Sequence, residues 1–162
     1  MIKYKIIVKN KKELIERIQK ISSKDHDLVI NGFSSYSVPY NYGADTAFDS
    51  LIKSVFEILK NKYKNNIYEI IDMWFNIYKK GGYVKEHNHT SKKYEKSDLK
   101  TGIFYLKKPL NSGELYINNK EIKLNENDFI IFDAEENHYT TKNKTNEDRI
   151  VISFNFLRSY NR

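Results

Sequence analysis

The chain of 162 residues contains no cysteine. This absence excludes a disulfide framework, a thiolate zinc site, an iron–sulfur cluster and a cysteine nucleophile. There is also no run near the roughly 18 apolar residues that a membrane helix requires. The first residues show neither the apolar stretch nor the cleavage site of a signal peptide. We therefore expect a cytoplasmic protein without a membrane partner, whose metal or acid–base chemistry depends on histidine and carboxylate.

The charge balance is basic, with 28 Lys and Arg against 21 Asp and Glu, which gives a net charge of +7. A basic balance raises the question of a nucleic-acid partner. Here the positive charge is almost all lysine spread along the chain, so nucleic acid stays open but is not favoured. Hydrophobic residues make up 40% of the chain, which is enough to bury a substantial core. The length fits one domain over residues 1–162.

The first 66 residues combine helical and irregular patterns. Residues 2–8 predict a short strand, and apolar residues at helical spacing predict an amphipathic helix over about 11–21. The segment 22–45 is predicted as a loop that either packs on its own aromatic residues or forms a functional flap. His26 in this loop is interpreted as a residue without a special role. A second helix is predicted over about 46–65.

From residue 67 onward the hydrophobic period is two, and no helical pattern interrupts it. Many short strands without helices between them indicate an antiparallel sandwich or barrel. The favoured fold is mainly β, a jelly-roll or cupin-like barrel of the double-stranded β-helix type over residues 67–157, braced by two N-terminal helices. The predicted strands are 67–79, 83–87, 101–107, 113–117, 120–124, 128–133, 138–142 and 149–157.

Two of these strands carry different residues on their two faces, because side chains alternate along a strand. One face of each is apolar, and the opposite face combines polar and aromatic residues where a water-facing strand of this lysine-rich chain would carry Lys and Glu. This pattern indicates a polar cavity inside the barrel. The cavity-facing residues are Asp72, Trp74, Asn76 and Tyr78 on the first strand and Arg149, Val151, Ser153 and Asn155 on the last.

Three of the four histidines lie in the β region and are candidate metal ligands. His87 and His89 are separated by one residue, so on a strand they point the same way and can bind one ion together. His138, from a distant strand, would complete a set of three. Imidazole suits iron, zinc, copper and nickel alike, so the ligands alone do not select the metal. The alternative is that the His-x-His pair lies on a surface strand without function.

Arg149 is one of only four arginines, and it opens the last strand on the inward face. A buried guanidinium keeps its proton and must be paired. Two interpretations remain at this point: a structural ion pair with an aspartate, or a bound ligand that carries a carboxylate, which the planar guanidinium fork accepts in bidentate geometry.

Over about residues 72–157 the sequence resembles a known family, the 2-oxoglutarate- and Fe(II)-dependent oxygenases of the H-x-H type. Six motifs follow the family's order, although each is weak alone. They are Trp74-x-Asn76-x-Tyr78, Gly81-Gly82-Tyr83, His87-x-His89, the strand TGIFYL that starts at Thr101, Phe132 with His138 six residues later, and the strand RIVISFN that starts at Arg149. The first seventy residues contribute nothing specific to the resemblance.

The resemblance implies an oxidoreductase that uses Fe(II), O2 and 2-oxoglutarate to hydroxylate a substrate, with release of succinate and CO2. It assigns the metal to His87, His89 and His138, and the distal carboxylate of 2-oxoglutarate to Arg149. Further residues would complete the cosubstrate site or orient ligands: Ser153, Tyr105, Tyr78, Asn76 and Asn155.

Departures from the family pattern leave alternatives open. Thr101, Asp128, Asp133, Ala134 and Val151 replace residues usual in the family, but none of them is a proposed metal ligand. Most such oxygenases have a carboxylate where this chain has His89, so either His89 binds the metal or water takes that place. A three-histidine dioxygenase that does not use 2-oxoglutarate and a metal-free binding module are the other two hypotheses. The small-molecule or peptidyl substrate and the oligomeric state are not readable from the sequence.

Overall fold

The computed structural model describes residues 1–160. Two helices and ten strands form the architecture, with short 3-10 turns before α2 and before β5. In chain order the elements are β1 (Ile2–Lys5), α1 (Lys11–Lys20), β2 (Lys24–His26), β3 (Val29–Ser34), α2 (Asp49–Lys62), β4 (Ile67–Val84), β5 (Leu99–Lys107), β6 (Leu115–Ile117), β7 (Lys120–Ile122), β8 (Asp128–Asp133), β9 (His138–Thr140) and β10 (Arg149–Ser159).

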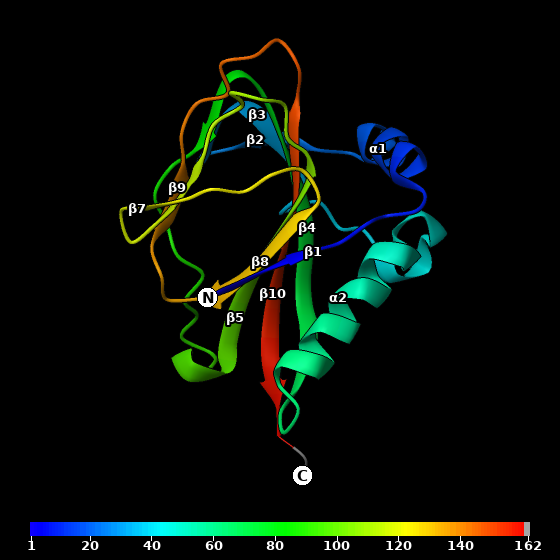
Figure 1. The fold of residues 1–162 in the computed structure, drawn as a ribbon, viewed down its shortest axis with the longest axis vertical. Helices are drawn as coiled ribbons and strands as arrows, with labels where there is room; N and C mark the ends of the chain where they lie inside the picture. Colours follow the sequence, from blue (N-terminus) through cyan, green and yellow to red (C-terminus); the bar gives the residue numbers. More distant parts are fainter. Residues whose placement is uncertain (161–162) are drawn as a thin grey trace.

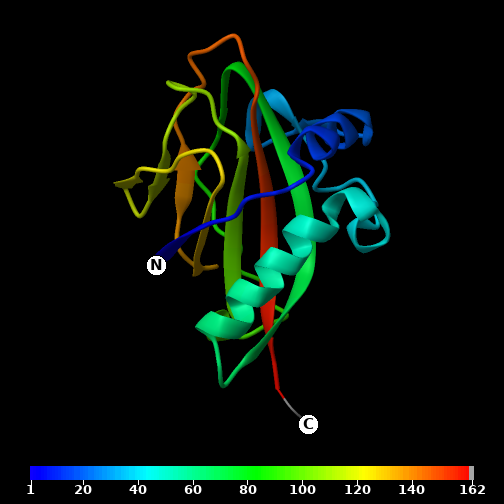
Figure 2. The same cartoon turned by 45° about the vertical axis from the view of Figure 1, so that its right-hand side comes forward.

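The strands form two antiparallel sheets. The larger sheet has seven strands in the order β1-β8-β5-β10-β4-β3-β2, and the smaller has three in the order β7-β6-β9. The smaller sheet lies across one face of the larger, and both helices lie on the other face (Figures 1 and 2). This arrangement confirms the predicted jelly-roll barrel with two helices that brace its outer face.

The main apolar core lies between the larger sheet and the helices. Outward side chains of the central strands, such as Phe75, Ile152 and Phe154, pack there with Leu14 of α1 and Leu51 of α2. All five are completely buried. Burial of this much aromatic and aliphatic surface stabilises the fold by roughly 1.5–3 kcal/mol per large side chain. The inward side chains of the same strands are thereby held at fixed positions inside the barrel.

The main error in the sequence prediction concerns the segment 22–45, which was expected to be a loop. It contains β2 and β3, which extend the larger sheet beyond β4. Asn31 and Gly32 interrupt the apolar pattern of β3, and Asn31 has a positive φ of 47°, in a region where the register against β4 shifts. The strand therefore depends on pairing with β4, which local sequence does not reveal.

Other boundaries also differ from the predictions. The two strands predicted at 67–79 and 83–87 are one long strand, β4, which continues through Gly81 and Gly82 and ends at Val84. The second helix begins three residues later than expected, after a 3-10 turn capped by Asp45, whose carboxylate accepts a hydrogen bond from the amide of Ala47. No helix within residues 1–160 is long and apolar enough to cross a membrane.

Candidate metal centre

Backbone pairing across the barrel mouth brings the three predicted histidines together. His87 follows the end of β4 and forms an isolated antiparallel bridge with His138, the first residue of β9, with N···O distances of 3.1 and 2.9 Å. The amide of His89 donates to the carbonyl oxygen of Ala134 at 2.8 Å. Backbone hydrogen bonds to Ala134 and His138 thus fix the positions of both His89 and His87.

The three imidazole rings converge and form the histidine cluster (His87, His89 and His138). Their candidate ligand nitrogens all lie within 4.8 Å of one another, and their ring centroids are 4.3 to 5.1 Å apart. Three nitrogen atoms at these distances can bind one metal ion together after small side-chain rotations. The donor set fits a divalent transition metal, since each residue contributes a neutral nitrogen ligand.

Hydrogen bonds at Nδ1 orient all three rings. His87 Nδ1 donates to the carbonyl oxygen of Lys85 at 2.7 Å and His138 Nδ1 to that of Glu136 at 3.1 Å. His89 Nδ1 donates to Asn155 Oδ1 at 2.7 Å, and Asn155 Nδ2 donates to Asp72 at 2.9 Å. Because these oxygens accept, each Nδ1 carries the proton and each Nε2 keeps a free lone pair. Ring orientation of this kind is typical of metal-binding histidines.

Burial keeps the histidine cluster in its neutral form. Desolvation lowers the pKa of His89 to about 4. Desolvation, together with the neighbouring rings of His87 and His89, lowers the pKa of His138 to about 3. The pKa of His87 is also lowered, mainly by burial. At neutral pH no proton therefore competes with a metal ion for the Nε2 lone pairs.

Arg149 lies at the start of β10 and is completely buried. Its Nη1 donates to the carbonyl oxygens of Ser112 and Thr141, and its Nη2 donates to Thr140 Oγ1 at 2.9 Å. The guanidinium carbon lies 4.4 Å from the centroid of the Tyr78 ring.

No carboxylate within residues 1–160 forms an ion pair with Arg149, and its buried Nε has no hydrogen-bond partner there. The ion pair with an aspartate, left open by the sequence, is therefore absent from the described part of the chain. A buried cation with an unused donor fits an anionic ligand.

A narrow cavity with about 40 Å³ of free space lies inside the barrel behind the histidine cluster. Polar groups of four predicted site residues line it: Tyr78, Tyr105, Ser153 and Asn76. Burial raises the pKa of both tyrosines, so their hydroxyl groups stay protonated and can donate hydrogen bonds. Asn76 Nδ2 donates to the Tyr78 hydroxyl group at 3.1 Å, and its buried Oδ1 has no partner within the described residues.

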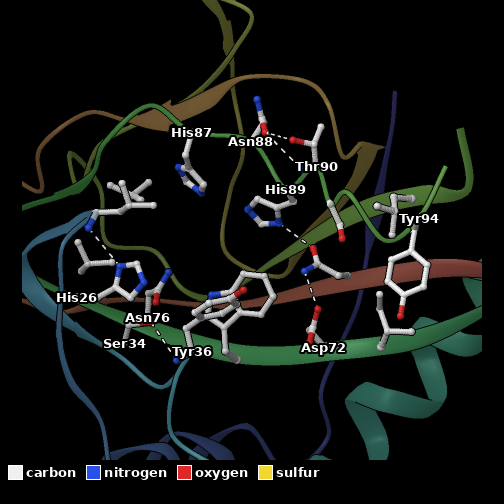
Figure 3. Close-up of a pocket in the computed structure, with 18 residues that line it drawn as sticks. His26, Ser34, Tyr36, Asp72, Asn76, His87, Asn88, His89, Thr90 and Tyr94 are labelled. Atoms are coloured by element: carbon white, nitrogen blue, oxygen red, sulfur yellow. Dashed lines mark hydrogen bonds between the residues drawn. The ribbon is translucent and has the colours of Figure 1, made fainter. Parts of the chain in front are cut away.

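A larger pocket of about 470 Å³ opens on the other side of the histidine cluster (Figure 3). Two segments contribute to it: Ser34 and Tyr36 from residues 22–45, which were predicted as a loop or flap, and Thr90 and Tyr94 from the lysine-rich segment 90–100 that follows His89. We call this cavity the mouth pocket. It is the only one of the two cavities with room for most of a substrate molecule.

Sequence reasoning missed several residues that build these cavities. His26 was interpreted as having no special role in a loop, but it lies at the end of β2 and lines the mouth pocket, with its ring centroid 5.8 Å from that of Tyr36. Asp72 was placed on the inward face without a role, and the structure connects it to His89 through Asn155.

Gly113 is a further missed position beside Arg149. It has a φ of +98°, and an added Cβ would lie 2.5 Å from Arg149 Nη1 and 2.3 Å from the carbonyl oxygen of Thr141. The NSG turn was the available signal for this glycine, because it indicates a residue with positive φ. The close approach to Arg149 could not be deduced from the turn alone.

Comparisons with solved structures agree with this architecture. A viral collagen prolyl hydroxylase from Paramecium bursaria Chlorella virus-1, solved as a 2-oxoglutarate complex, has a TM-score of 0.70 at 22% identity, over 98% of this chain and 96% of that chain. A Pseudomonas putida prolyl-4-hydroxylase has a TM-score of 0.74 at 10% identity, over 99% and 92%. HygX from Streptomyces hygroscopicus, solved with nickel, 2-oxoglutarate and hygromycin B, has a TM-score of 0.65 at 11% identity, over 91% and 78%. These likenesses show the fold.

Sequence comparison shows the family. No curated protein matches the chain in sequence. The family model described as aspartyl/asparaginyl beta-hydroxylase, in contrast, matches residues 3–159. Together with the fold, this match confirms the predicted relationship to the 2-oxoglutarate- and Fe(II)-dependent oxygenases and the predicted enzyme class. The chain belongs to the aspartyl/asparaginyl beta-hydroxylase family.

Proposed function

We propose that this protein is an Fe(II)- and 2-oxoglutarate-dependent dioxygenase that hydroxylates a small-molecule or peptidyl substrate. Fe(II), when bound, would supply the activation of O2 by which substrate C–H becomes C–OH while 2-oxoglutarate becomes succinate and CO2. His87, His89 and His138 would hold the ion through their Nε2 atoms. The convergence of these three lone pairs supports His89, rather than water, as the third ligand.

Arg149 would bind the distal carboxylate of 2-oxoglutarate, and its environment is the main observation that supports the proposal. A fully buried guanidinium without a carboxylate partner in the described chain favours an anionic ligand, and it lies on the inward face of the strand that also bears Asn155. Tyr78, Tyr105 and Ser153 line the narrow cavity beside the histidine cluster, and their hydroxyl groups would donate further hydrogen bonds to the cosubstrate. Thr140, which accepts a hydrogen bond from Arg149, also lines this cavity.

The remaining inward residues would orient the His89 ring and the cosubstrate and would shield the reacting centre from water. Asn155 would hold the His89 ring through its bond to Nδ1, with its own amide fixed by Asp72. Asn76 forms no hydrogen bond with a histidine within residues 1–160 and instead donates to the Tyr78 hydroxyl group, so its role would be toward the cosubstrate. The apolar cavity walls, including Val84, Ile103 and Leu115, would exclude water from the reacting centre.

The cytoplasmic location expected from the sequence stays a prediction.

The test is anaerobic addition of Fe(II) and then 2-oxoglutarate to the metal-free protein, with visible absorption as the readout. We expect a charge-transfer band of the chelated keto acid in the wild type, and in Arg149→Met an increase of about 100-fold in the 2-oxoglutarate concentration needed to form it, since a buried charge-assisted pair is worth a few kcal/mol. Lys107→Met, a change of a cation on the neighbouring strand β5, is the matched control and should leave the band unchanged.

Two outcomes would contradict the proposal. Iron binding without the band would favour a three-histidine dioxygenase that does not use 2-oxoglutarate. No iron binding at all would leave only the metal-free binding module.

A further inference from the structure

The charges around the mouth pocket differ from those of the chain as a whole. The protein carries an excess of seven positive charges, yet the described residues that line this pocket include no lysine or arginine. Asp72 is the only acidic residue among them. The part of the molecule where a substrate would bind is therefore neutral to acidic, in an otherwise basic protein.

Asp72 is only partly used by the protein itself. Its Oδ2 accepts the hydrogen bond from Asn155 Nδ2, and within residues 1–160 its Oδ1 has no hydrogen-bond partner and the side chain forms no ion pair. The residue is exposed to the pocket. A carboxylate with a free oxygen at a pocket wall can accept a hydrogen bond from a cationic donor.

Aromatic rings form a continuous wall beside Asp72. His26, Tyr36, Trp74 and His89 follow one another with ring centroids 5.8, 5.0 and 5.4 Å apart. Figure 3 shows His26 on one side of Tyr36 and Asp72 on the other side, toward Tyr94. Tyr36 is 53% exposed, so part of its surface is available to a ligand. Aromatic faces next to a carboxylate are the combination that binds ammonium and guanidinium groups.

We propose that the mouth pocket selects a substrate that carries an amine or guanidine group, held between the Asp72 carboxylate and the rings of Tyr36 and Trp74. As a statement about the substrate, this inference rests on the proposed function. Asp72 and His89 are connected through Asn155, so a cation bound at Asp72 lies next to the histidine cluster. The cation would thereby fix which carbon of the substrate faces the metal.

Lysines near the pocket do not remove this preference. Lys96 forms an ion pair with Glu135, and Lys100 forms one with Asp133. Lys93 lies with its ammonium 5.2 Å from the centroid of the Tyr94 ring, so this cation covers Tyr94 and not the wall formed by Tyr36 and Trp74. More distant lysines act through solvent, where charges are screened beyond about 8 Å at physiological salt.

Trp74 provides a direct readout, because it is the only tryptophan of the chain and lies in the pocket wall. The experiment measures its fluorescence in the 162-residue chain without metal, during titration with Nα-acetyl-lysine amide, Nα-acetyl-norleucine amide or Nα-acetyl-glutamate amide. We expect half-saturation by the lysine compound at a concentration about five- to tenfold lower than by the norleucine compound. The glutamate compound should bind more weakly than both.

Three variants locate the effect. Asp72→Asn keeps an acceptor for Asn155 but removes the charge, so it should abolish the preference for lysine over norleucine. Tyr36→Leu should reduce the preference about threefold. Glu69→Gln, a change of an exposed carboxylate on the same strand, is the matched control and should leave the preference intact.

A further ligand distinguishes the source of the cation. A pentapeptide with central lysine that binds more tightly than the amide would assign the cation to a peptide, and equal binding would assign it to a small amine. Either result supports the site.

Equal half-saturation by the lysine and norleucine compounds, tighter binding of the glutamate compound, or an undiminished preference in Asp72→Asn would overturn the inference. Because the titration uses no metal, its failure is separate from a failure of the proposed function. A charge-transfer band without amine preference would refute the pocket inference alone. An amine preference without the band would refute the dioxygenase proposal and leave a pocket for cationic ligands.

Discussion

The two faces of β4 and β10 differ in how completely their buried groups are satisfied. On the outer face, Phe75, Ile152 and Phe154 are completely buried in an apolar core that needs no hydrogen bonds. On the inner face of the same strands, Asn76 and Arg149 are buried with polar atoms that have no partner within residues 1–160. The apolar core on the outer face thus fixes the strands, and with them the positions of the polar residues on the inner face.

This difference indicates which residues contribute mainly to stability and which contribute mainly to ligand binding. Buried polar groups without partners cost free energy, commonly about 1–3 kcal/mol each. A fold retains them when the surrounding structure holds them in position, and they then mark a place where a ligand completes the bonding. Outer-face substitutions should therefore change the free energy of unfolding, and inner-face substitutions should change ligand binding.

The largest effect is expected from the outer face of β10. Phe154→Ala should lower the free energy of unfolding by about 3–5 kcal/mol, because the completely buried ring packs against Phe129 and Phe156 and its removal leaves a cavity in the core. Urea denaturation followed by circular dichroism measures this value. Ser153→Ala, the neighbouring residue on the inner face, should cost less than about 1 kcal/mol. Equal losses for the two variants would contradict the separation of the faces.

A smaller effect is expected from pH, and it arises from the histidine cluster. His138 has a lowered pKa, about 3 in the folded protein against 6.5 for an unperturbed histidine, so the unfolded chain binds a proton that the folded metal-free protein does not. Stability is then fully present above pH 6.5 and is lost as the pH falls toward 3. Between pH 7 and pH 5 we expect a loss of roughly 2 kcal/mol from this residue.

The measurement is urea denaturation of the metal-free protein at both pH values. His138→Gln should show a smaller loss, whereas His26→Gln, at the far end of the mouth pocket, should behave as the wild type does. Stability that is constant or higher at pH 5 would show that burial does not keep His138 neutral.

The smallest effect concerns the bond between Asn155 and His89. Asn155→Ala removes the acceptor for His89 Nδ1, so we expect about tenfold weaker Fe(II) binding, as is usual when a partner of a ligating histidine is lost. Anaerobic titration calorimetry measures this affinity. Ser153→Ala should bind Fe(II) as the wild type does. Unchanged affinity in Asn155→Ala would mean that His89 needs no support from Asn155 or does not bind the metal.

Side-chain alternation and motif order are local properties, so the sequence could predict which side chains of β4 and β10 face the inside of the barrel. Inward placement of Trp74, Asn76, Arg149 and Ser153 followed from a period of two, and the structure confirms that all four face the inside of the barrel. The convergence of His87 and His89 with His138 depended on the resemblance, since nothing local indicates that residues about fifty positions apart form a bridge.

The errors share one physical cause. Both β2 and β3 were predicted as loop, because Asn31 and Gly32 break the apolar pattern of β3 and this strand depends on pairing with β4. His26 was dismissed for the same reason. Without β2 in the sheet, no argument from sequence could place His26 beside Tyr36 at the wall of the mouth pocket.

The sequence by itself determined the fold class, the inward faces of β4 and β10 and the identity of the candidate ligands, because these follow from side-chain alternation and residue chemistry. Only the tertiary structure decided what each group meets. Within residues 1–160 it left Arg149 without a carboxylate partner, gave each histidine of the cluster an acceptor at Nδ1, and placed the carboxylate of Asp72 beside an aromatic wall. The bonds of His87 and His138 at Nδ1 are local, to carbonyl oxygens two residues away. The bond from His89 to Asn155 joins residues far apart in the chain, and the surroundings of Arg149 and Asp72 likewise depend on how the strands assemble around the cavity.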